Sequence, residues 1–206
     1  LGMLAKPAMP RLSEFMLRRI GSDGGPKAIA ALVDGIAQAK DDTTRLLFLR
    51  AVRSSLQGQP HADAPASWVT VGPNLLASQD PAIQLQAAAL GATFQQAEAA
   101  DELRKIVTDA KRTATDREEA LSALLSGRTA RLSSTLVALL QDQELRPAAI
   151  RGLSLYEDAS ATKAILGLYA QLTPDEQRMA LGTLCSRQAS ANSLMDAIAA
   201  KSIPAS

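Results

Sequence analysis

Residues Thr115–Gly127, T-D-R-E-E-A-L-S-A-L-L-S-G, contain the pattern that much of the chain repeats. Thr115 is predicted to cap the first turn of a helix, and Glu118 to reach back to it in a capping box. The apolar residues that follow share one helical face: Ala120, Leu121, Leu124 and Leu125. Gly127 is predicted to end the helix in a left-handed conformation. The stretch therefore predicts one amphipathic helix with its own start and stop signals.

The same pairing of alanine with a larger apolar residue recurs along the chain. The equivalent pairs are Ala89-Leu90, Ala149-Ile150 and Ala180-Leu181, with Phe48-Leu49 as an earlier and bulkier version. From Leu90 onward the larger residues are spaced by 31, 29 and 31 residues, and the step from Leu49 to Leu90 is 41. A period of about 30 residues containing two helices is typical of stacked helical hairpins. We therefore predict an all-α protein and, more specifically, an α-solenoid.

The composition supports this fold class and excludes several kinds of site. Alanine and leucine dominate the 206 residues, whereas aromatic residues make up 3%. Such a composition suits helices that pack through small side chains and is poor for β-sandwiches or barrels. The single cysteine excludes an internal disulfide and a multi-cysteine zinc site. A net charge of +1 gives no overall field that would attract nucleic acid or a membrane.

The first residues give little targeting information. No apolar run approaches the roughly 18 residues needed to cross a bilayer, and the start, L-G-M-L-A-K-P-A-M-P, lacks the apolar core of a signal peptide. Because the first residue is Leu rather than Met, we expect a processed chain or a segment of a longer protein. The compartment is not predicted from composition.

Start and stop signals divide the chain into six predicted units of a single repeat domain. The units span about residues 10–40, 41–79, 80–113, 114–142, 143–172 and 173–201. Asp80-Pro81 and the capping box of Thr173 with Glu176 mark two helix starts. Asp42 is predicted to cap the helix of the second unit, and Gly72-Pro73 to kink or break the next one.

Two stretches resemble HEAT-like repeats of the short, bilin-lyase type. They are D-P-A-I-Q-L-Q-A-A-A-L-G from Asp80 and E-L-R-P-A-A-I-R-G-L from Glu144. A polar residue precedes each anchoring Leu or Ile by four positions: Arg45, Gln86, Arg117, Arg146 and Gln177. The resemblance implies that these residues form a polar ladder, each bonding an Asp or a carbonyl of the neighbouring repeat. The acidic partners it suggests are Asp80, Asp109 and Asp142.

A weaker resemblance covers the whole chain. P-A-M-P-R-L, D-D-T-T-R-L-L-F-L-R and P-A-S-W, in this order, resemble the HEAT-like segment of large exported bacterial proteins. In those proteins the segment lies between a propeller-type dehydrogenase-like domain and a C-terminal cytochrome c domain. The resemblance implies a spacer in an exported or periplasmic redox protein. The haem-attachment motif Cys-x-x-Cys-His is absent from the sequence, so no haem is predicted.

The residue types that often perform catalysis have simpler interpretations here. His61 lies in a proline-rich loop and is predicted to be exposed. Cys185 follows Leu181 by four residues and is predicted to be a buried, inert thiol. The acidic pairs Glu118-Glu119 and Asp175-Glu176 stand in first turns, where capping and the helix dipole explain them. We therefore predict no catalytic residue, no cofactor and no metal.

The remaining candidates concern partners. Trp68 is predicted to pack in the core, with a role on a partner surface as the alternative. Arg104, Lys105 and Arg131 belong to basic groups and are candidates for that surface. Because acids are interleaved and aromatic residues are few, nucleic-acid binding is not expected.

We therefore predict a non-catalytic helical-repeat scaffold for protein–protein or interdomain interaction. The alternative is a HEAT-like enzyme or nucleic-acid-binding solenoid, of the DNA glycosylase or bilin lyase type.

Overall fold

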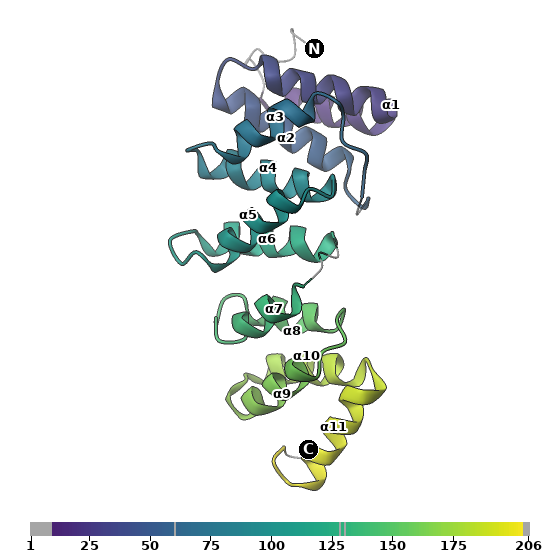
Figure 1. The fold of residues 1–206 in the computed structure, drawn as a ribbon, viewed down its shortest axis with the longest axis vertical. Helices are drawn as coiled ribbons and strands as arrows, with labels where there is room; N and C mark the ends of the chain where they lie inside the picture. The colour runs from purple at the N-terminus through teal and green to yellow at the C-terminus, as the bar shows by residue number, and fades with distance from the viewer. Residues whose placement is uncertain (1–9, 60, 128, 130, 204–206) are drawn as a thin grey trace. The chain divides into compact units, whose positions relative to one another are not determined.

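The structure, a computed structural model, describes residues 10–59, 61–127, 129 and 131–203, without the side chains of residues 10–18 and 20–24. The first residues of the P-A-M-P-R-L segment therefore lie outside the described part. The described residues form eleven α-helices and one 3-10 turn and contain no strand (Figure 1). The prediction of an all-α protein is confirmed.

The chain divides into two compact units, Leu1–Thr129 and Ala130–Ser206, where the sequence predicts a single repeat domain. The first unit contains α1 Pro10–Gln38, α2 Asp42–Ser55, α3 Trp68–Leu76, α4 Pro81–Thr93, α5 Ala97–Thr108 and α6 Ala114–Ser126. The second contains α7 Ser133–Leu139, α8 Arg146–Leu153, α9 Ala159–Leu168, the 3-10 turn Tyr169–Gln171, α10 Pro174–Cys185 and α11 Gln188–Ala199. The boundary falls inside the predicted unit 114–142.

Helix α4 is the centre of the first unit. It packs against α2, α3, α5 and α6, and α1 packs against α2 and α3. Contacts on every side explain why α4 is apolar almost all round, with Gln86 as its one buried polar residue. In the second unit α8 packs against α7 and α10, and α11 packs against α9 and α10.

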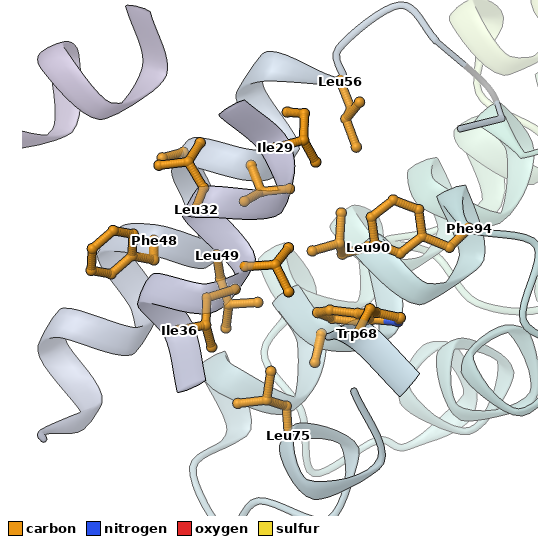
Figure 2. Packing of buried hydrophobic residues seen from close by; sticks show 14 of the residues in the cluster. Ile29, Leu32, Ile36, Phe48, Leu49, Leu56, Trp68, Leu75, Leu90 and Phe94 are labelled. Carbon is orange, nitrogen blue, oxygen red and sulfur yellow. The ribbon is translucent and has the colours of Figure 1, made fainter. Parts of the chain in front are cut away.

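The core of the first unit joins side chains from its first four helices. Figure 2 shows Trp68 of α3 beside Phe94, with apolar side chains of α1 and α2 packed against them. The rings of Trp68 and Phe94 meet edge to face, with centroids 5.3 Å apart. Trp68 is fully buried, and its Nε1 donates to Gln96 Oε1 at 2.8 Å. This residue therefore has both apolar packing and a partner for its polar group.

Close helix packing depends on glycine at one position of α4. A Cβ atom on Gly91 would lie 2.6 Å from the Cβ of Ala99 on α5. Real Cβ atoms do not approach so closely, so α4 and α5 require glycine here. The contact agrees with the small-residue packing predicted from composition.

Two predicted helix starts are confirmed and two are wrong. Asp80 caps α4, and Thr173 with Glu176 forms a capping box on α10. The cap of α6 is Thr113 rather than Thr115, and the cap of α2 is Asp41 rather than Asp42. In both cases the true cap has extended backbone that aims its side chain at the third residue on, whereas the predicted residue already lies inside the helix.

Three predicted breaks also differ from the structure. Gly127 has φ −75° and so ends α6 without the left-handed conformation. The sequence also predicts a turn over residues 22–25, whereas α1 stays helical through residue 24 and is broken at Gly25, which has φ +59°. Helix α3 continues through Gly72-Pro73, since proline removes only one N–H from this short helix.

Within the described part of the chain, no helix has both the length and the apolar character required to span a membrane.

Candidate functional site

Five side chains, here called rung residues, each bond a main-chain carbonyl at the end of the preceding helix. The bonds are Arg45 Nη2 to Ala39 O (3.2 Å), Gln84 Nε2 to Leu76 O (3.3 Å), Arg117 Nε to Val107 O (2.9 Å), Arg146 Nε to Leu140 O (2.6 Å) and Gln177 Nε2 to Tyr169 O (3.1 Å). The last carbonyls of a helix have no partner within it and carry partial negative charge. Each rung residue therefore ties the start of one helix to the end of the helix before it.

The rung residues share one position relative to the residue that caps their helix. Each stands four residues after its cap and donates its own main-chain N–H to the carbonyl of that cap. The caps are Asp41, Asp80, Thr113 and Thr173, and for Arg146 the equivalent residue is Asp142, which lies in the turn before α8, where Leu145 is the N-cap. The motif is thus an Asp or Thr followed four residues later by an Arg or Gln.

This geometry corrects part of the predicted ladder. Arg45, Arg117, Arg146 and Gln177 make the contact, but Gln84 takes the place predicted for Gln86. The acceptors in these contacts are carbonyls, one of the two predicted kinds of partner, and none of the three suggested carboxylates. The predicted acidic partners instead accept from nearby main-chain N–H groups: Asp80 from Ala82 and Ile83, Asp109 from Lys111, and Asp142 from Glu144 and Leu145.

Gln86 belongs to a second network, which joins α2, α4 and α6. Its Oε1 accepts from Arg53 Nη1 at 2.6 Å, and its Nε2 donates to Glu119 Oε1 at 2.9 Å. Arg53 also forms an ion pair with the same oxygen of Glu119. Three helices are therefore joined by one buried amide and one half-buried ion pair.

The network lies beside an open hollow of about 400 Å³. The hollow is lined by polar and charged side chains alone: Arg50, Arg53, Ser54, Gln57, Gln86 and Glu119. Burial by itself would raise the pKa of Glu119, but the hydrogen bond and charge of Arg53, with Gln86 and Arg50, lower it overall. Glu119 is therefore an anion at neutral pH. We take this hollow as the candidate binding site.

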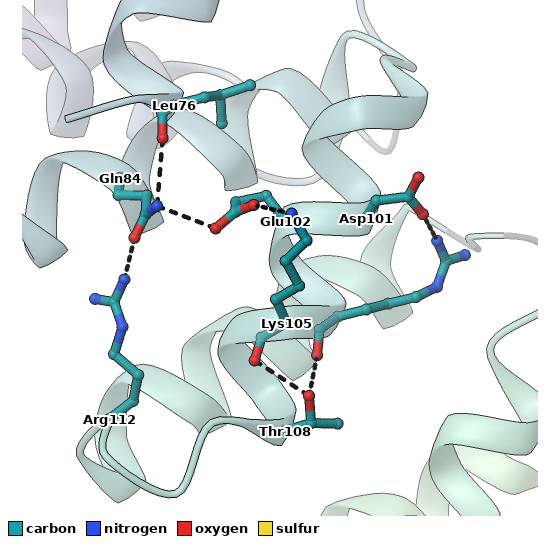
Figure 3. Close-up of polar contacts among 8 residues, drawn as sticks. Leu76, Gln84, Asp101, Glu102, Lys105, Thr108 and Arg112 are labelled. Atoms are coloured by element: carbon teal, nitrogen blue, oxygen red, sulfur yellow. Dashed lines mark hydrogen bonds and ion pairs between the residues drawn. The ribbon is translucent and has the colours of Figure 1, made fainter. Parts of the chain in front are cut away.

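The predicted partner-surface residues lie in different surroundings. Trp68 is fully buried, so it belongs to the core and cannot contact a partner. Arg104 Nη1 pairs with Asp101 Oδ1 at 2.5 Å, and Lys105 Nζ pairs with Glu102 Oε2 at 2.9 Å. Figure 3 shows both pairs on α5. Arg131 is exposed and lies in the second compact unit.

Figure 3 also shows that Gln84 forms hydrogen bonds with three residues, Leu76, Glu102 and Arg112. Besides Leu76 O, it donates to Glu102 Oε1 at 3.0 Å and accepts from Arg112. Arg112 in turn donates to Pro81 O at 3.1 Å. Asp101 and Glu102 therefore neutralise Arg104 and Lys105, whereas Arg112 is bonded to neutral groups.

The other residues considered for chemistry have separate surroundings. His61 is exposed, as predicted, and lines a hollow of about 530 Å³ with the loop 61–65. Cys185 is also exposed, so the prediction of a buried thiol is wrong. Ala180 and Leu184 occupy the buried face of α10, and Cys185 lies about 100° round the helix from Leu184.

The acidic pairs act only partly in local structure, because Glu119 bonds Arg53 and Gln86 of other helices, whereas the sequence predicts a capping role for it. Glu118 is exposed, and Asp175 pairs with Arg178 of the same helix. Glu176 accepts from Thr173 N at 2.8 Å and faces Arg146 Nη1 at 3.6 Å.

One further carboxylate joins two helices of the second unit. Asp158 caps α9 and accepts from Ser133 at the start of α7. Hydrogen bonds from Ser133 and Ser160 lower the pKa of Asp158 to about 2. The apolar pattern predicts a helix over residues 161–170, which begins three residues after the cap, so the sequence prediction misses Asp158. An Asp followed by Ala-Ser-Ala was the available signal.

Among the described residues, no group of three His, Cys, Asp or Glu side chains is arranged to hold a metal ion. Comparisons with protein-family models, curated proteins and solved structures found no match. By its fold and its candidate site, the chain is an all-α protein with a charged hollow lined by three packed helices.

Proposed function

We propose that the chain is a non-catalytic α-solenoid of HEAT-like repeats that binds another protein or a flanking domain. The main support is the recurrence of the cap and rung motif at five helices. In a helical-repeat protein each repeat contacts its neighbours through equivalent positions. A motif that joins successive helices in the same way at each step fits that architecture.

The hollow over α4 supports a binding role. Its lining comes from α2, the turn after α2, α4 and α6, so a ligand would contact three helices at once. Extended surfaces of this kind are how solenoids bind partners. The same scaffold suits a spacer between domains of an exported protein, which is what the weaker resemblance implies.

The charges favour a protein partner over nucleic acid. On α5 the basic residues Arg104 and Lys105 are each paired with an acid of the same helix. The hollow has no aromatic side chain on which a base could stack. The proposal therefore does not extend to DNA or RNA.

Site-specific photo-crosslinking tests this function. A photoreactive amino acid at Gln57, an exposed residue of the hollow, should capture a discrete protein in the native cells, and Arg53→Gln should reduce the yield. The same probe at Glu98, exposed on α5, is the matched control. Equal capture at both positions, or none at Gln57, would contradict the proposed site.

A further inference from the structure

The hollow has a charge arrangement that points to a particular ligand. Resting on the proposed function, we propose that it binds an acidic stretch of a protein partner through the guanidinium groups of Arg50 and Arg53. These residues stand three positions apart on α2, so their side chains extend from the same side of the helix. Two guanidinium groups side by side suit a chain with repeated carboxylates.

Arg53 is held ready for such a ligand. Its Nη1 donates to Gln86 Oε1 and to Glu119, which fixes the position of the guanidinium. A guanidinium has five N–H groups, so this arrangement leaves Nε and Nη2 for further acceptors. A preorganised donor loses less entropy when the ligand binds.

Arg50 supplies the excess positive charge. It is exposed, and its charge helps to lower the pKa of Glu119. Two arginines against one glutamate leave the lining with a net positive charge. Ser54 and Gln57 add neutral hydrogen-bonding groups beside them.

The lining residues favour a peptide with several carboxylates over a compact phosphate. Glu119 would repel a compact, doubly charged phosphate placed between the arginines. A peptide has carboxylates separated by several ångströms, so it can contact Arg50 and Arg53 while avoiding Glu119. An apolar or stacking ligand would find no matching side chain in this lining.

Fluorescence anisotropy tests the proposal with a labelled peptide of alternating glutamate and glycine. The unmodified protein should bind this peptide and not its glutamine counterpart. Arg50→Gln should weaken binding about threefold to tenfold, and Arg50→Lys, which keeps the charge, should weaken it less. Arg104→Gln is the matched control, because it removes the same charge from α5 and should leave binding unchanged.

Three results would overturn the proposal: no binding of the glutamate peptide, equal weakening by Arg104→Gln and Arg50→Gln, or tighter binding of a single-stranded DNA that also depends on Arg50. Circular dichroism should show that the Arg50 variants remain folded, since Arg50 is exposed. If peptide binding fails while Gln57 still captures a protein, the acidic ligand is wrong and the proposed function stands.

Discussion

Arg53 on α2 and Glu119 on α6 form an ion pair although they are 66 residues apart and α4 packs against both of their helices. Gln86 of α4 bonds both partners. The side chains of α2 and α6 therefore meet over the buried amide of α4. This contact links the outer members of a three-helix group and shapes the candidate site.

We expect the pair to stabilise the first unit modestly. A double-mutant cycle with Arg53→Gln and Glu119→Gln should give a coupling energy of about 0.5–1.5 kcal/mol, because both groups are only half-buried. Urea unfolding at low and high salt measures it, and the coupling should fall as salt rises. The exposed pair Arg178 and Asp175 on α10 is the control and should give less. A coupling near zero at low salt would show that the ion pair does not contribute to the stability of the first unit.

Arg117 should be the most sensitive rung residue. Its side chain is buried, and its Nε donates to Val107 O. Arg117→Met leaves that carbonyl without this partner and should cost about 1–3 kcal/mol of unfolding free energy. Arg178→Met, at an exposed position, should change stability by no more than about 0.5 kcal/mol. Similar values for both variants in urea unfolding would argue against a structural role for the rung contacts.

Glu176 should make stability depend on pH in the acidic range. Burial alone raises its pKa, but hydrogen bonds from Thr173 and the charge of Arg146 outweigh burial, so its pKa lies below the ordinary 4.5. The folded state therefore gains stability from Glu176 above pH 4.5 and loses it as the pH falls through the lowered pKa. Glu176→Gln should cost about 1–2 kcal/mol at pH 7 and less in acid. Unfolding curves from neutral to acidic pH measure this, with Asp196→Asn on the exposed face of α11 as the control. A difference that does not shrink in acid would show that the charge is not responsible.

Gly91→Ala should loosen the contact between α4 and α5. The added methyl would lie 2.6 Å from Ala99 Cβ, so the helices must move apart, at a cost of about 1–3 kcal/mol. Gly182→Ala on α10 is the matched control, because a Cβ there meets nothing within 4 Å. Its better helix propensity should add up to about 1 kcal/mol. Thermal unfolding distinguishes the two, and a stable Gly91→Ala variant would show that this approach is not required.

Trp68 should report the unfolding of the first unit separately. It is the only tryptophan in the sequence and is fully buried in that unit. We expect its fluorescence to follow the first unit and far-ultraviolet circular dichroism to follow both, so the two urea transitions should not coincide. Gly182→Ala lies in the second unit, so it should shift the midpoint of the transition seen by circular dichroism and leave the midpoint seen by Trp68 fluorescence unchanged. Coincident transitions in both proteins would mean that the chain unfolds as one cooperative unit.

The helices themselves were largely predictable, because their start signals act over a few residues. Asp80 before Pro81 and the Thr173–Glu176 box need only neighbouring backbone to cap a helix. Thr113 and Asp41 were misassigned because another acceptor, Thr115 or Asp42, follows within two positions. The backbone conformation at the cap selects between such neighbours, and composition does not specify it.

The ladder shows how a correct pattern gave one wrong residue. Counting back from the anchor Leu90 selects Gln86, whereas counting forward from the cap Asp80 selects Gln84. The two counts agree elsewhere because the cap precedes the anchor by eight residues there, as for Thr113 and Leu121, but by ten in α4. The cap was the better reference, since it fixes where the first turn begins.

By itself the sequence determined the helical class and most helix positions, because periodicity and capping are local properties of the chain, whereas four of the five rung residues were implied by the resemblance to HEAT-like repeats. Only the tertiary structure placed Arg53, Gln86 and Glu119 around one hollow and exposed Cys185. These outcomes depend on which face of each helix its neighbours cover. That choice is made by packing between segments far apart in the sequence, so no local pattern specifies it.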